Sequence, residues 1–328
     1  MMYSIVIVNY KAGHLVIDCL NSIAADFRKQ NDIIVVDNAS GDDIESKLKI
    51  NFPEVTFIQA GYNSGFSRAN NMGIRAAKGE CVLLLNSDTL DIDSNIKKCF
   101  HRFEHDVNAV ACGVQLLNMD NSPQISGSYF MKGGLNFLMS VPYLGLLIRR
   151  VGLMLQVKKT SIKETSNIVE VDWLNGAFLM FKKSAIEKIG WMDEDFFLYS
   201  EEIEWCSRIN KMGKLFVYGD LNVYHLEGGS SKKAFESDTR GYQNLTDKKG
   251  LQLLVSHLLR IRKQYGIAWL LFHFLFFLAA ILVYWIVALF SFNGKIWKNC
   301  VGYTSNIFNS ISYLFRIIKA KPFFYKVL

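Results

Sequence analysis

The chain has 328 residues, half of them hydrophobic and a fifth charged, which allows one large domain with an appendage or two small domains. It contains only four prolines and no low-complexity tract, so long disordered regions are excluded. The six cysteines show no CxxC spacing, which favours buried free thiols in a reducing compartment over a zinc site or a disulfide framework. The chain enters an apolar run at Tyr3 without a basic region before it, so no signal peptide is expected.

The net charge of +7 is unevenly distributed. Residues 232–328 carry 14 lysines and arginines against three acidic residues, a net +11, whereas the preceding residues carry −4. A basic tail on an acidic body indicates binding either to nucleic acid or to an anionic membrane surface.

Four apolar, β-branched runs in the first 90 residues predict strands that are buried on both faces: 3–9, 32–38, 55–60 and 81–88. Helical patterns lie between them, which predicts an α/β fold with a doubly wound, mostly parallel sheet. Ligands bind beyond the carboxyl ends of the strands in such sheets. The polar residues at these ends are therefore candidate binding residues: Asn9, Tyr10, Asp37, Asn38, Asn63, Asn86, Ser87 and Asp88.

The next part of the body is less regular. Residues 108–117 and 176–181 read as further strands. Residues 129–157 form an insertion rich in glycine and leucine that contains Arg149 and Arg150. This insertion is either an amphipathic element on a membrane or a loop packed on the core, and the sequence leaves both open.

Residues 267–292 contain a single titratable side chain, His273. As a helix this segment would be about 39 Å long, more than the roughly 30 Å of a bilayer's hydrocarbon core. We therefore expect membrane insertion, which explains the basic tail without nucleic acid. Basic residues precede the segment and place the body on the cytoplasmic face of the membrane: Lys248, Lys249, Arg260, Arg262 and Lys263.

A second apolar stripe follows at helical spacing, after Lys295 and Lys298: Val301, Thr304, Phe308, Ile311, Phe315 and Ile318. The stripe suits a helix that lies on an anionic leaflet. In that case both ends of the 267–292 segment lie on the cytoplasmic side and the segment is re-entrant. A single membrane span remains equally compatible with the sequence.

Three patterns carry candidate chemistry. Asp88 ends a buried strand and could hold a divalent metal or cap a turn. Asp37 could accept hydrogen bonds from a base or a ribose, or start a turn. The glycine-rich residues 61–73 and Arg68 could face phosphates. The first strand–helix turn lacks the glycine fingerprint of dinucleotide binding, which argues against a nicotinamide-dependent dehydrogenase.

Six segments together resemble glycosyltransferase family 2, and most closely its bacterial rhamnosyltransferase-like members. They occur in the family's order over residues 3–230: "SIVIVNYKAG", "IIVVDNASGD", "YNSGFSRANNMGI", "LLLNSDT", "VDWLNGAFLMFKK" and "DEDFFLYSEEIEWCSRI". The resemblance implies a GT-A fold with a Rossmann-like nucleotide-sugar-binding domain, a nucleotide-diphosphate sugar donor, a divalent metal (Mg²⁺ or Mn²⁺) and inversion at the anomeric carbon.

The resemblance also implies roles for individual residues. Asp37 would bind the base or ribose, Arg68 would lie near the diphosphate, and Asp88 matches the last Asp of the metal-binding motif, with Asn86 where the first Asp would stand. His225 would assist the metal or the diphosphate, or is a core histidine. The family's general base is the Asp of a Glu-Asp pair, and here that pair is Glu201-Glu202. We expect the acceptor pocket to be bordered by Asp172, Trp173, Asn175 and Glu201.

Helical geometry separates the three glutamates of "SEEIEW". If Ser200 is the N-cap, a step of about 100° per residue from Glu201 puts Glu202 inside an apolar face formed by Trp205, Cys206 and Ile209. Glu204 falls on the opposite face, where we expect a surface ion pair with Arg208. A carboxylate on a buried helix face has a raised proton affinity, which suits a general base. The alternative is that Glu202 is a structural acceptor and that Glu201 or Asp195 is the base.

The sequence thus predicts a catalytic domain at 1–235 and a membrane-associated region at 236–328. The predicted function is transfer of a sugar from dTDP-rhamnose or a UDP-hexose to a saccharide acceptor, lipid-linked because of the hydrophobic tail, in cell-surface polysaccharide or O-antigen synthesis. The alternative is a non-catalytic, membrane-bound nucleotide-sugar-binding or scaffold protein.

Overall fold

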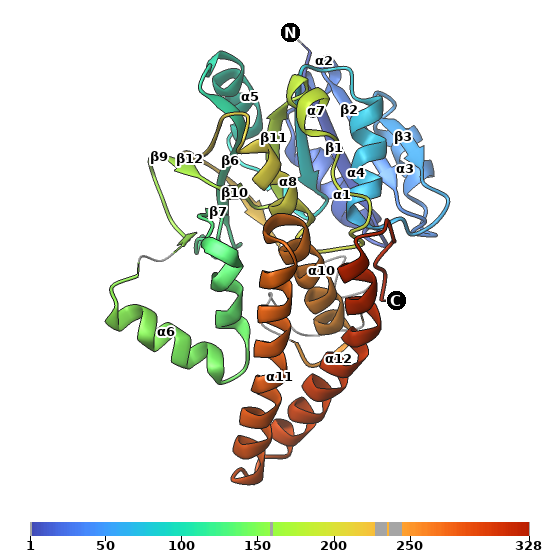
Figure 1. Ribbon diagram of the computed structural model, residues 1–328. Coiled ribbons are helices and arrows are strands. Elements are labelled where there is room, and N and C mark those ends of the chain that lie inside the picture. The colour runs from blue at the N-terminus through green and yellow to red at the C-terminus, as the bar shows by residue number, and fades with distance from the viewer. Residues whose placement is uncertain (1, 158–159, 227–234, 236–244, 328) are drawn as a thin grey trace. The chain divides into compact units, whose positions relative to one another are not determined.

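The computed structural model describes residues 2–157, 160–226, 235 and 245–327 (Figure 1). It consists of two compact units. Unit 1 comprises Met1–Tyr129, Ser161–Glu194 and Trp205–Lys233, and unit 2 comprises Phe130–Thr160, Asp195–Glu204 and Ala234–Leu328. Each unit has its own hydrophobic core.

Unit 1 is built, within the described residues, on a nine-stranded sheet of order β3-β2-β1-β4-β11-β6-β12-β5, with β9 paired to β12. The strands are β1 (Ser4–Asn9), β2 (Asp32–Asp37), β3 (Thr56–Gln59), β4 (Cys81–Asn86), β5 (Thr89–Asp91), β6 (Ala109–Leu117), β9 (Ile168–Val171), β11 (Phe178–Lys182) and β12 (Lys214–His225). The run from β3 to β4 is parallel, β11 is antiparallel to both of its neighbours, and β12 is parallel to β6. The predicted α/β class and the predicted strands are confirmed.

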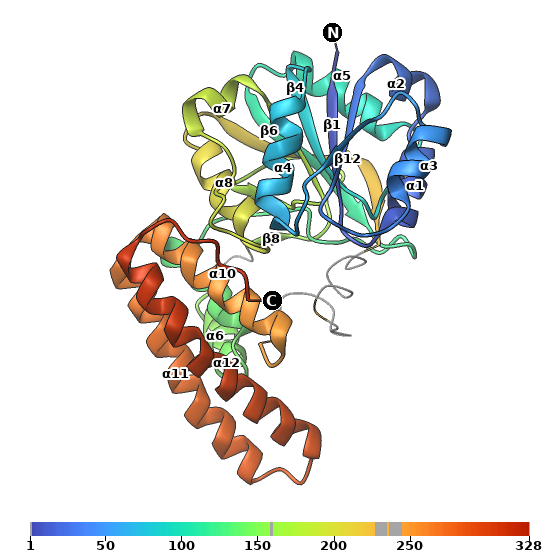
Figure 2. The same cartoon turned by 90° about the vertical axis from the view of Figure 1, so that its right-hand side faces the viewer.

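Helices cover both faces of this sheet because alternate strand residues point to opposite sides. Ile5 and Ile7 of β1 lie in the core under α1 (Gly13–Ser22), α2 (Ala25–Gln30), α3 (Ile44–Asn51) and α5 (Asn95–His105). Val6 between them lies in the core under α4 (Gly65–Ala76), α7 (Ser184–Ile189) and the later turns of α8 (Glu201–Ile209) (Figure 2). Helix α4 packs so closely that a Cβ at Gly73 would lie 2.2 Å from Cγ1 of Val6.

A second, three-stranded sheet of order β10-β7-β8 belongs to unit 1. It is formed by β7 (Gly127–Ser128), β8 (Ser161–Ile162) and β10 (Trp173–Leu174). All pairings are antiparallel, with Trp173 opposite Ser128. This small sheet contains Trp173 of the predicted acceptor pocket, and Asp172 and Asn175 flank its strand β10.

Unit 2 is helical. Its elements are the 3-10 segment η1 (Lys132–Ser140), α6 (Leu144–Met154), α10 (Lys248–Tyr265), α11 (Ile267–Leu289) and α12 (Gly294–Lys319). Helix α12 runs back along α11: the hydroxyl of Tyr303 donates to the carbonyl of Phe277 at 3.0 Å, and the indole of Trp285 donates to Thr304 at 3.1 Å. Helices α11 and α12 therefore form an antiparallel hairpin.

In the described part of the chain, α11 is the one helix whose length and composition would let it cross a membrane, with a mean hydropathy of 2.5. Helix α12 is apolar on two sides. One side is buried in unit 2: Cys300, Tyr303, Ile307, Leu314 and Ile317. The predicted stripe is offset from it by one residue, and its members Val301, Phe308 and Phe315 are exposed.

Insertion 129–157 folds as η1 and α6, so it is not a plain loop. Helix α6 leaves several large apolar side chains exposed: Leu146, Leu147, Val151, Leu153 and Met154. Uncovered apolar surface of this extent is typical of a segment that meets a membrane or a partner.

Candidate functional site

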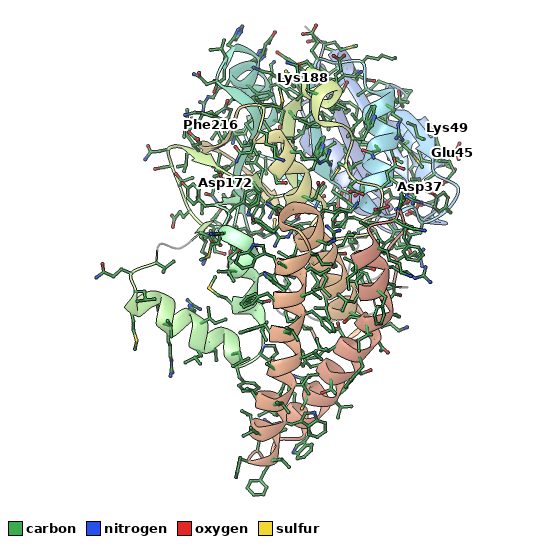
Figure 3. The ribbon with its side chains drawn as sticks, in the orientation of Figure 1. Asp37, Glu45, Lys49, Asp172, Lys188 and Phe216 are labelled. Carbon is green, nitrogen blue, oxygen red and sulfur yellow. The ribbon has the colours of Figure 1, made fainter. Side chains whose placement is uncertain are left out.

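The carboxyl ends of β1, β2 and β3 form the first polar cluster. The amide of Asn9 donates to Oδ1 of Asp37 at 2.8 Å, and the amide of Gln59 donates to Oδ2 at 2.9 Å. The backbone N–H of Ser40 also donates to Oδ2, at 3.1 Å. Asp37 is buried and lies at the edge of unit 1 opposite Lys188 of α7 (Figure 3). Its carboxylate is therefore fixed at the strand ends, where parallel sheets bind ligands.

Asn38 orders the glycine-rich turn before α4. Its side-chain oxygen accepts from both the backbone N–H and the hydroxyl of Ser64 at 2.7 Å, and its amide donates to Oδ1 of Asn63 at 3.2 Å. One turn into α4, Nε of Arg68 donates to the carbonyl of Glu194 at 3.0 Å. The half-buried Tyr10 lies beneath the ammonium of Lys11, at 5.5 Å from its ring centroid.

The second cluster joins the ends of β4 and β12. Oδ1 of Asp88 lies 3.4 Å from Nε2 of His225, and the amide of Asn86 lies 3.5 Å from the same nitrogen. Ser87 is buried beside them. Within the described residues no group of three or more His, Cys, Asp and Glu side chains converges, so the candidate metal ligands are one carboxylate and one imidazole.

Hydrogen bonds determine which nitrogen of His225 carries the proton. The amide nitrogen of Gln124 donates to Asn118 and to the carbonyl of His225, both at 2.7 Å, so its Oε1 is an acceptor. This Oε1 lies 2.8 Å from Nδ1 of His225, which must therefore donate. In the neutral ring Nε2 then presents a lone pair to the Asp88 carboxylate. The amide of Asn86 donates to the same lone pair at 3.5 Å, and a proton or a metal ion between Asp88 and His225 would bind both side chains.

The distance between these two acceptors fits a shared metal. Ligands about 2.1 Å from one ion, at angles between octahedral and tetrahedral, are roughly 3.0–3.4 Å apart. The 3.4 Å between Asp88 and His225 lies at the upper end of that range. Residues Asn86 and Ser87 supply further oxygen atoms on the same strand end, which hard divalent cations prefer.

The predicted acceptor residues lie on and beside β10. The backbone N–H of Asp172 donates to the carbonyl of Ser128 at 3.0 Å, and its Oδ1 accepts from the amide of Asn210 at 3.1 Å. The amide of Asn175 donates to the carbonyl of Ile125 at 3.0 Å. Trp173 is half-buried in β10. Trp173 thus lies in this edge strand, and Asp172 and Asn175 flank it.

Helix α8 carries the glutamates. Glu201 is 2% exposed, Glu202 is 6% exposed and Glu204 is 7% exposed. The inward position predicted for Glu202 is confirmed, and Trp205, Cys206 and Ile209 on the same face are fully buried. The surface position expected for Glu204 is wrong, because its side chain is as buried as that of Glu202.

The entry into α8 is strained. Tyr199 and Ser200 have φ values of 75° and 69°, in the left-handed region that side chains disfavour by about 1–2 kcal/mol per residue. The carbonyl of Ser200 accepts from the N–H of Glu204 at 3.0 Å, so Ser200 occupies the N-cap position without the extended backbone usual there. Strain of this kind persists only where surrounding contacts hold it.

Those contacts come from within unit 2. Lys263 of α10 pairs with Oδ2 of Asp195 at 2.7 Å, and the backbone N–H of Phe323 donates to Oδ1 at 3.0 Å. The hydroxyl of Ser256 donates to the carbonyl of Leu198 at 2.7 Å. The C-terminal segment joins Phe196 through a β-bridge at Tyr325. Both oxygens of Asp195 are thus engaged in structural contacts, which argues against Asp195 as the base.

Burial changes the proton affinity of both leading glutamates. Loss of hydration raises the pKa of Glu202 to about 7, although the positive charge of Arg260 opposes the rise. Burial, and then the charge of Glu202, raise the pKa of Glu201 well above its ordinary value. Both carboxyl groups therefore bind protons more readily than an ordinary glutamate, and a pKa of about 7 suits Glu202 to accept a proton near neutral pH.

Sequence reasoning missed three members of these clusters. Gln59 ends β3 and Ser40 follows β2, so a complete inventory of strand ends would have included them. Gln124, which fixes the tautomer of His225, lies in an irregular segment that gives no signal.

Comparisons with known proteins identify the family of the chain. A family model described as Glycosyl transferase family 2 matches residues 4–167, half of the chain. A low-salt glycan biosynthesis hexosyltransferase of Haloferax volcanii is 29% identical over 212 residues, which cover 63% of this chain and 61% of the relative. An N-acetylglucosaminyl-diphospho-decaprenol L-rhamnosyltransferase of Mycobacterium tuberculosis is 24% identical and covers 65% of this chain and 72% of the relative. The chain thus spans about three fifths of the first relative's length.

Among solved structures, GalNAc-T7, crystallised with UDP, GalNAc and Mn²⁺, has a similar fold. Its TM-score is 0.50 at 14% identity, and the match covers 68% of this chain and 43% of that one. This likeness supports the GT-A fold of unit 1. Because the family model matches half of the sequence, the chain belongs to glycosyltransferase family 2.

Proposed function

We propose that the protein is a metal-dependent, inverting glycosyltransferase that works at the cytoplasmic face of a membrane. The donor is a nucleotide-diphosphate sugar, dTDP-rhamnose or a UDP-hexose, and the acceptor is a lipid-linked saccharide in polysaccharide or O-antigen synthesis. The observation that carries the proposal is Glu202, a carboxyl group buried on α8 whose pKa is raised to about 7.

Glu202 is proposed as the general base. Its carboxylate takes the proton of the acceptor hydroxyl, and the freed oxygen forms a bond to the anomeric carbon of the donor. The bond from that carbon to the diphosphate breaks, and its electron pair leaves with the nucleotide. A base with a pKa near the working pH combines a sufficient ionised fraction with useful basicity. Attack opposite the leaving group inverts the anomeric configuration.

Asp88 and His225 are proposed to hold the divalent metal, Mg²⁺ or Mn²⁺. A bound ion there would take up charge on the departing diphosphate. The facing acceptor atoms of the two side chains, 3.4 Å apart, support this assignment. Asn86 and Ser87 would supply further oxygen atoms to the ion or its water, and Arg68 is proposed to bind the diphosphate.

Asp37 is proposed to accept hydrogen bonds from the base or ribose of the donor. Asn9 and Gln59 hold its carboxylate from either side, which leaves little freedom for reorientation when the donor binds. Tyr10, Asn38 and Asn63 complete the donor pocket at the same strand ends. Asp172, Trp173 and Asn175 of unit 1 and Glu201 of unit 2 are proposed as acceptor-binding residues.

Membrane attachment is proposed to occur through unit 2. The α11–α12 hairpin returns the chain to the end at which it began, which favours the re-entrant arrangement over a single span. The exposed apolar residues of α6 and of the outer side of α12 would meet the bilayer. A relative that acts on a diphospho-decaprenol acceptor supports a lipid-linked acceptor here.

The alternative of a non-catalytic scaffold is less consistent with the buried glutamates. Two adjacent carboxyl groups without full hydration destabilise a fold, and a scaffold gains nothing from them.

Glu202→Gln removes the base and keeps the shape of the side chain. We expect kcat to fall by about 10²–10⁴-fold, while the donor Kd changes less than about threefold, because general-base catalysis contributes in this range. The measurement is nucleotide release together with donor titration by calorimetry. Glu45→Gln, an exposed glutamate on α3, is the control. Near-normal turnover of Glu202→Gln would show that another group is the base.

The pH dependence of stability tests the burial of Glu202 independently. Its folded-state pKa, about 7, lies above the ordinary 4.5. Its contribution to stability is thus fully present below pH 4.5 and is lost as the pH rises through 7. Glu202→Gln should therefore gain in thermal midpoint over the wild type between pH 5 and pH 8. Parallel curves for the two proteins would contradict the burial of an ionised carboxyl group.

Asp88→Ala should abolish metal-dependent donor binding, because it leaves His225 as the one remaining strong ligand of the proposed site. Donor affinity is measured with Mn²⁺ and with EDTA. In the wild type EDTA should weaken binding at least tenfold, and in the variant the two affinities should be equal and low. A variant that retains the wild-type response to EDTA would refute the assignment of the metal to Asp88.

A further inference from the structure

Helix α6 is attached to unit 2 along one of its sides. Leu144 and Ile148, one turn apart, pack against the core that also contains residues of α10, α11 and α12. Beside them, a Cβ at Gly145 would lie 2.3 Å from the carbonyl oxygen of Met139, so the first turn of α6 rests directly on the end of η1. These contacts fix which side of the helix faces the protein.

The other side of α6 is apolar and exposed. Met154 is 81% exposed, and Leu146, Leu147, Val151 and Leu153 are exposed as well. At about 100° per residue, these five side chains cover nearly half of the helix circumference, on the side away from the core. Single apolar residues on a surface are ordinary, whereas a group of this size on one helix is typical of a surface that contacts a membrane or another protein.

Two arginines lie on the same exposed side, and they favour a lipid surface over a protein. Arg150 falls at the centre of the apolar arc and Arg149 at its edge. Within the described residues, neither forms a hydrogen bond or an ion pair. Residues 121–163 contain six lysines and arginines and no aspartate or glutamate. Because a guanidinium group matches the geometry of a phosphate, this combination of cations and apolar side chains complements the headgroups and acyl chains of an anionic leaflet.

The place of α6 within unit 2 agrees with such a surface. Figure 1 shows α6 lying crosswise to α11, the candidate membrane helix, and extending away from it on one side. The two helices are joined through η1, where a Cβ at Gly133 would lie 2.2 Å from the ring of Trp269 on α11. When α11 is inserted into a bilayer, a helix crosswise to it lies along the membrane surface, as interfacial amphipathic helices do.

The position of α6 in the chain links it to the proposed acceptor residues. Helix α6 lies in the connection between β7 and β8, which pair with Ser128 opposite Ser161. Ser128 also pairs with Trp173 of β10. The chain therefore leaves for α6, and returns from it, at strands of the small sheet that contains Trp173. A helix bound to the leaflet would tether this sheet to the surface at which a lipid-linked acceptor presents its saccharide.

We propose that α6 docks on the surface of an anionic phospholipid leaflet, with Arg149 and Arg150 on lipid phosphates and the surrounding apolar side chains in the acyl region. The proposal rests on the proposed attachment of unit 2 to a membrane, and it names the lipid class that the attachment requires. Each cation at a leaflet of negative surface potential strengthens binding, so docking depends on the fraction of anionic lipid and weakens as the salt concentration rises.

A fluorescent label on α6 of the full chain tests this without any assay of activity. Met154→Cys carries an environment-sensitive fluorophore, and the label is selective because the native cysteines are buried. The chain is reconstituted into nanodiscs of phosphatidylcholine alone, and into nanodiscs in which about a third of the lipid is phosphatidylglycerol. We expect a blue shift of the emission in the second kind of disc alone, and a smaller shift at about 0.5 M salt.

The double substitution Arg149→Gln and Arg150→Gln should lower the docking equilibrium constant in the phosphatidylglycerol discs about tenfold or more, because two cations are lost from the contact. The matched control is Lys47→Gln with Lys49→Gln, which removes two exposed charges from α3 and should leave the emission unchanged. Emission that is equal in both kinds of disc, or that the arginine variant does not alter, would overturn the proposal.

The same experiment separates this proposal from the proposed function. A labelled chain that enters neither kind of disc would refute the attachment of unit 2 to a membrane and the docking of α6 together. A wild type that shows the lipid-dependent shift but transfers no sugar would refute the glycosyltransferase proposal and support the docking of α6.

Discussion

The burial of a carboxyl group at the first turn of α8 is the constraint on which the rest of this account depends. Glu202 cannot be hydrated as a surface glutamate is, so its proton affinity rises toward neutrality. Surrounding charges then determine whether it is a base or a neutral hydrogen-bond donor. A negative charge on both Glu201 and Glu202 is unfavourable, because the two carboxylates repel each other. The positive charge of Arg260 favours the ionised form of Glu202. The left-handed backbone of Tyr199 and Ser200 is the local conformational cost of this arrangement.

The donor-side residues and the buried glutamates belong to different units of the chain. The α/β sheet of unit 1 gathers the donor-side residues, because parallel strands present their polar ends at one edge. The segment with Glu201 and Glu202 is grouped with the helices of unit 2, and its preceding loop is held by α10 and the C-terminal segment. Phe196 and Tyr199 in this loop and the candidate membrane helix α11 are parts of the same hydrophobic core.

Much of unit 1 was predictable from sequence, because its strands are continuous β-branched runs that end in isolated polar residues. Helical phase alone placed Glu202 inward. The same reasoning failed for Glu204, because the phase of one helix does not tell which distant segments pack against its first turn. It also could not tell which apolar side of α12 faces the protein, since both sides carry large hydrophobic residues. The role of Gln124 required coordinates, because it contacts His225, about a hundred residues away, and no local pattern connects the two.

The most direct test of the central claim is a donor panel with the full chain and a lipid-linked saccharide acceptor. dTDP- and UDP-sugars are supplied with Mg²⁺ or Mn²⁺, nucleotide release is measured, and the anomeric configuration of the product is read by NMR. The account predicts release from one donor class, only with the metal and the acceptor present, and a product whose anomeric configuration is inverted. A product that retains the donor's configuration, or release that is unaffected by EDTA, would contradict it.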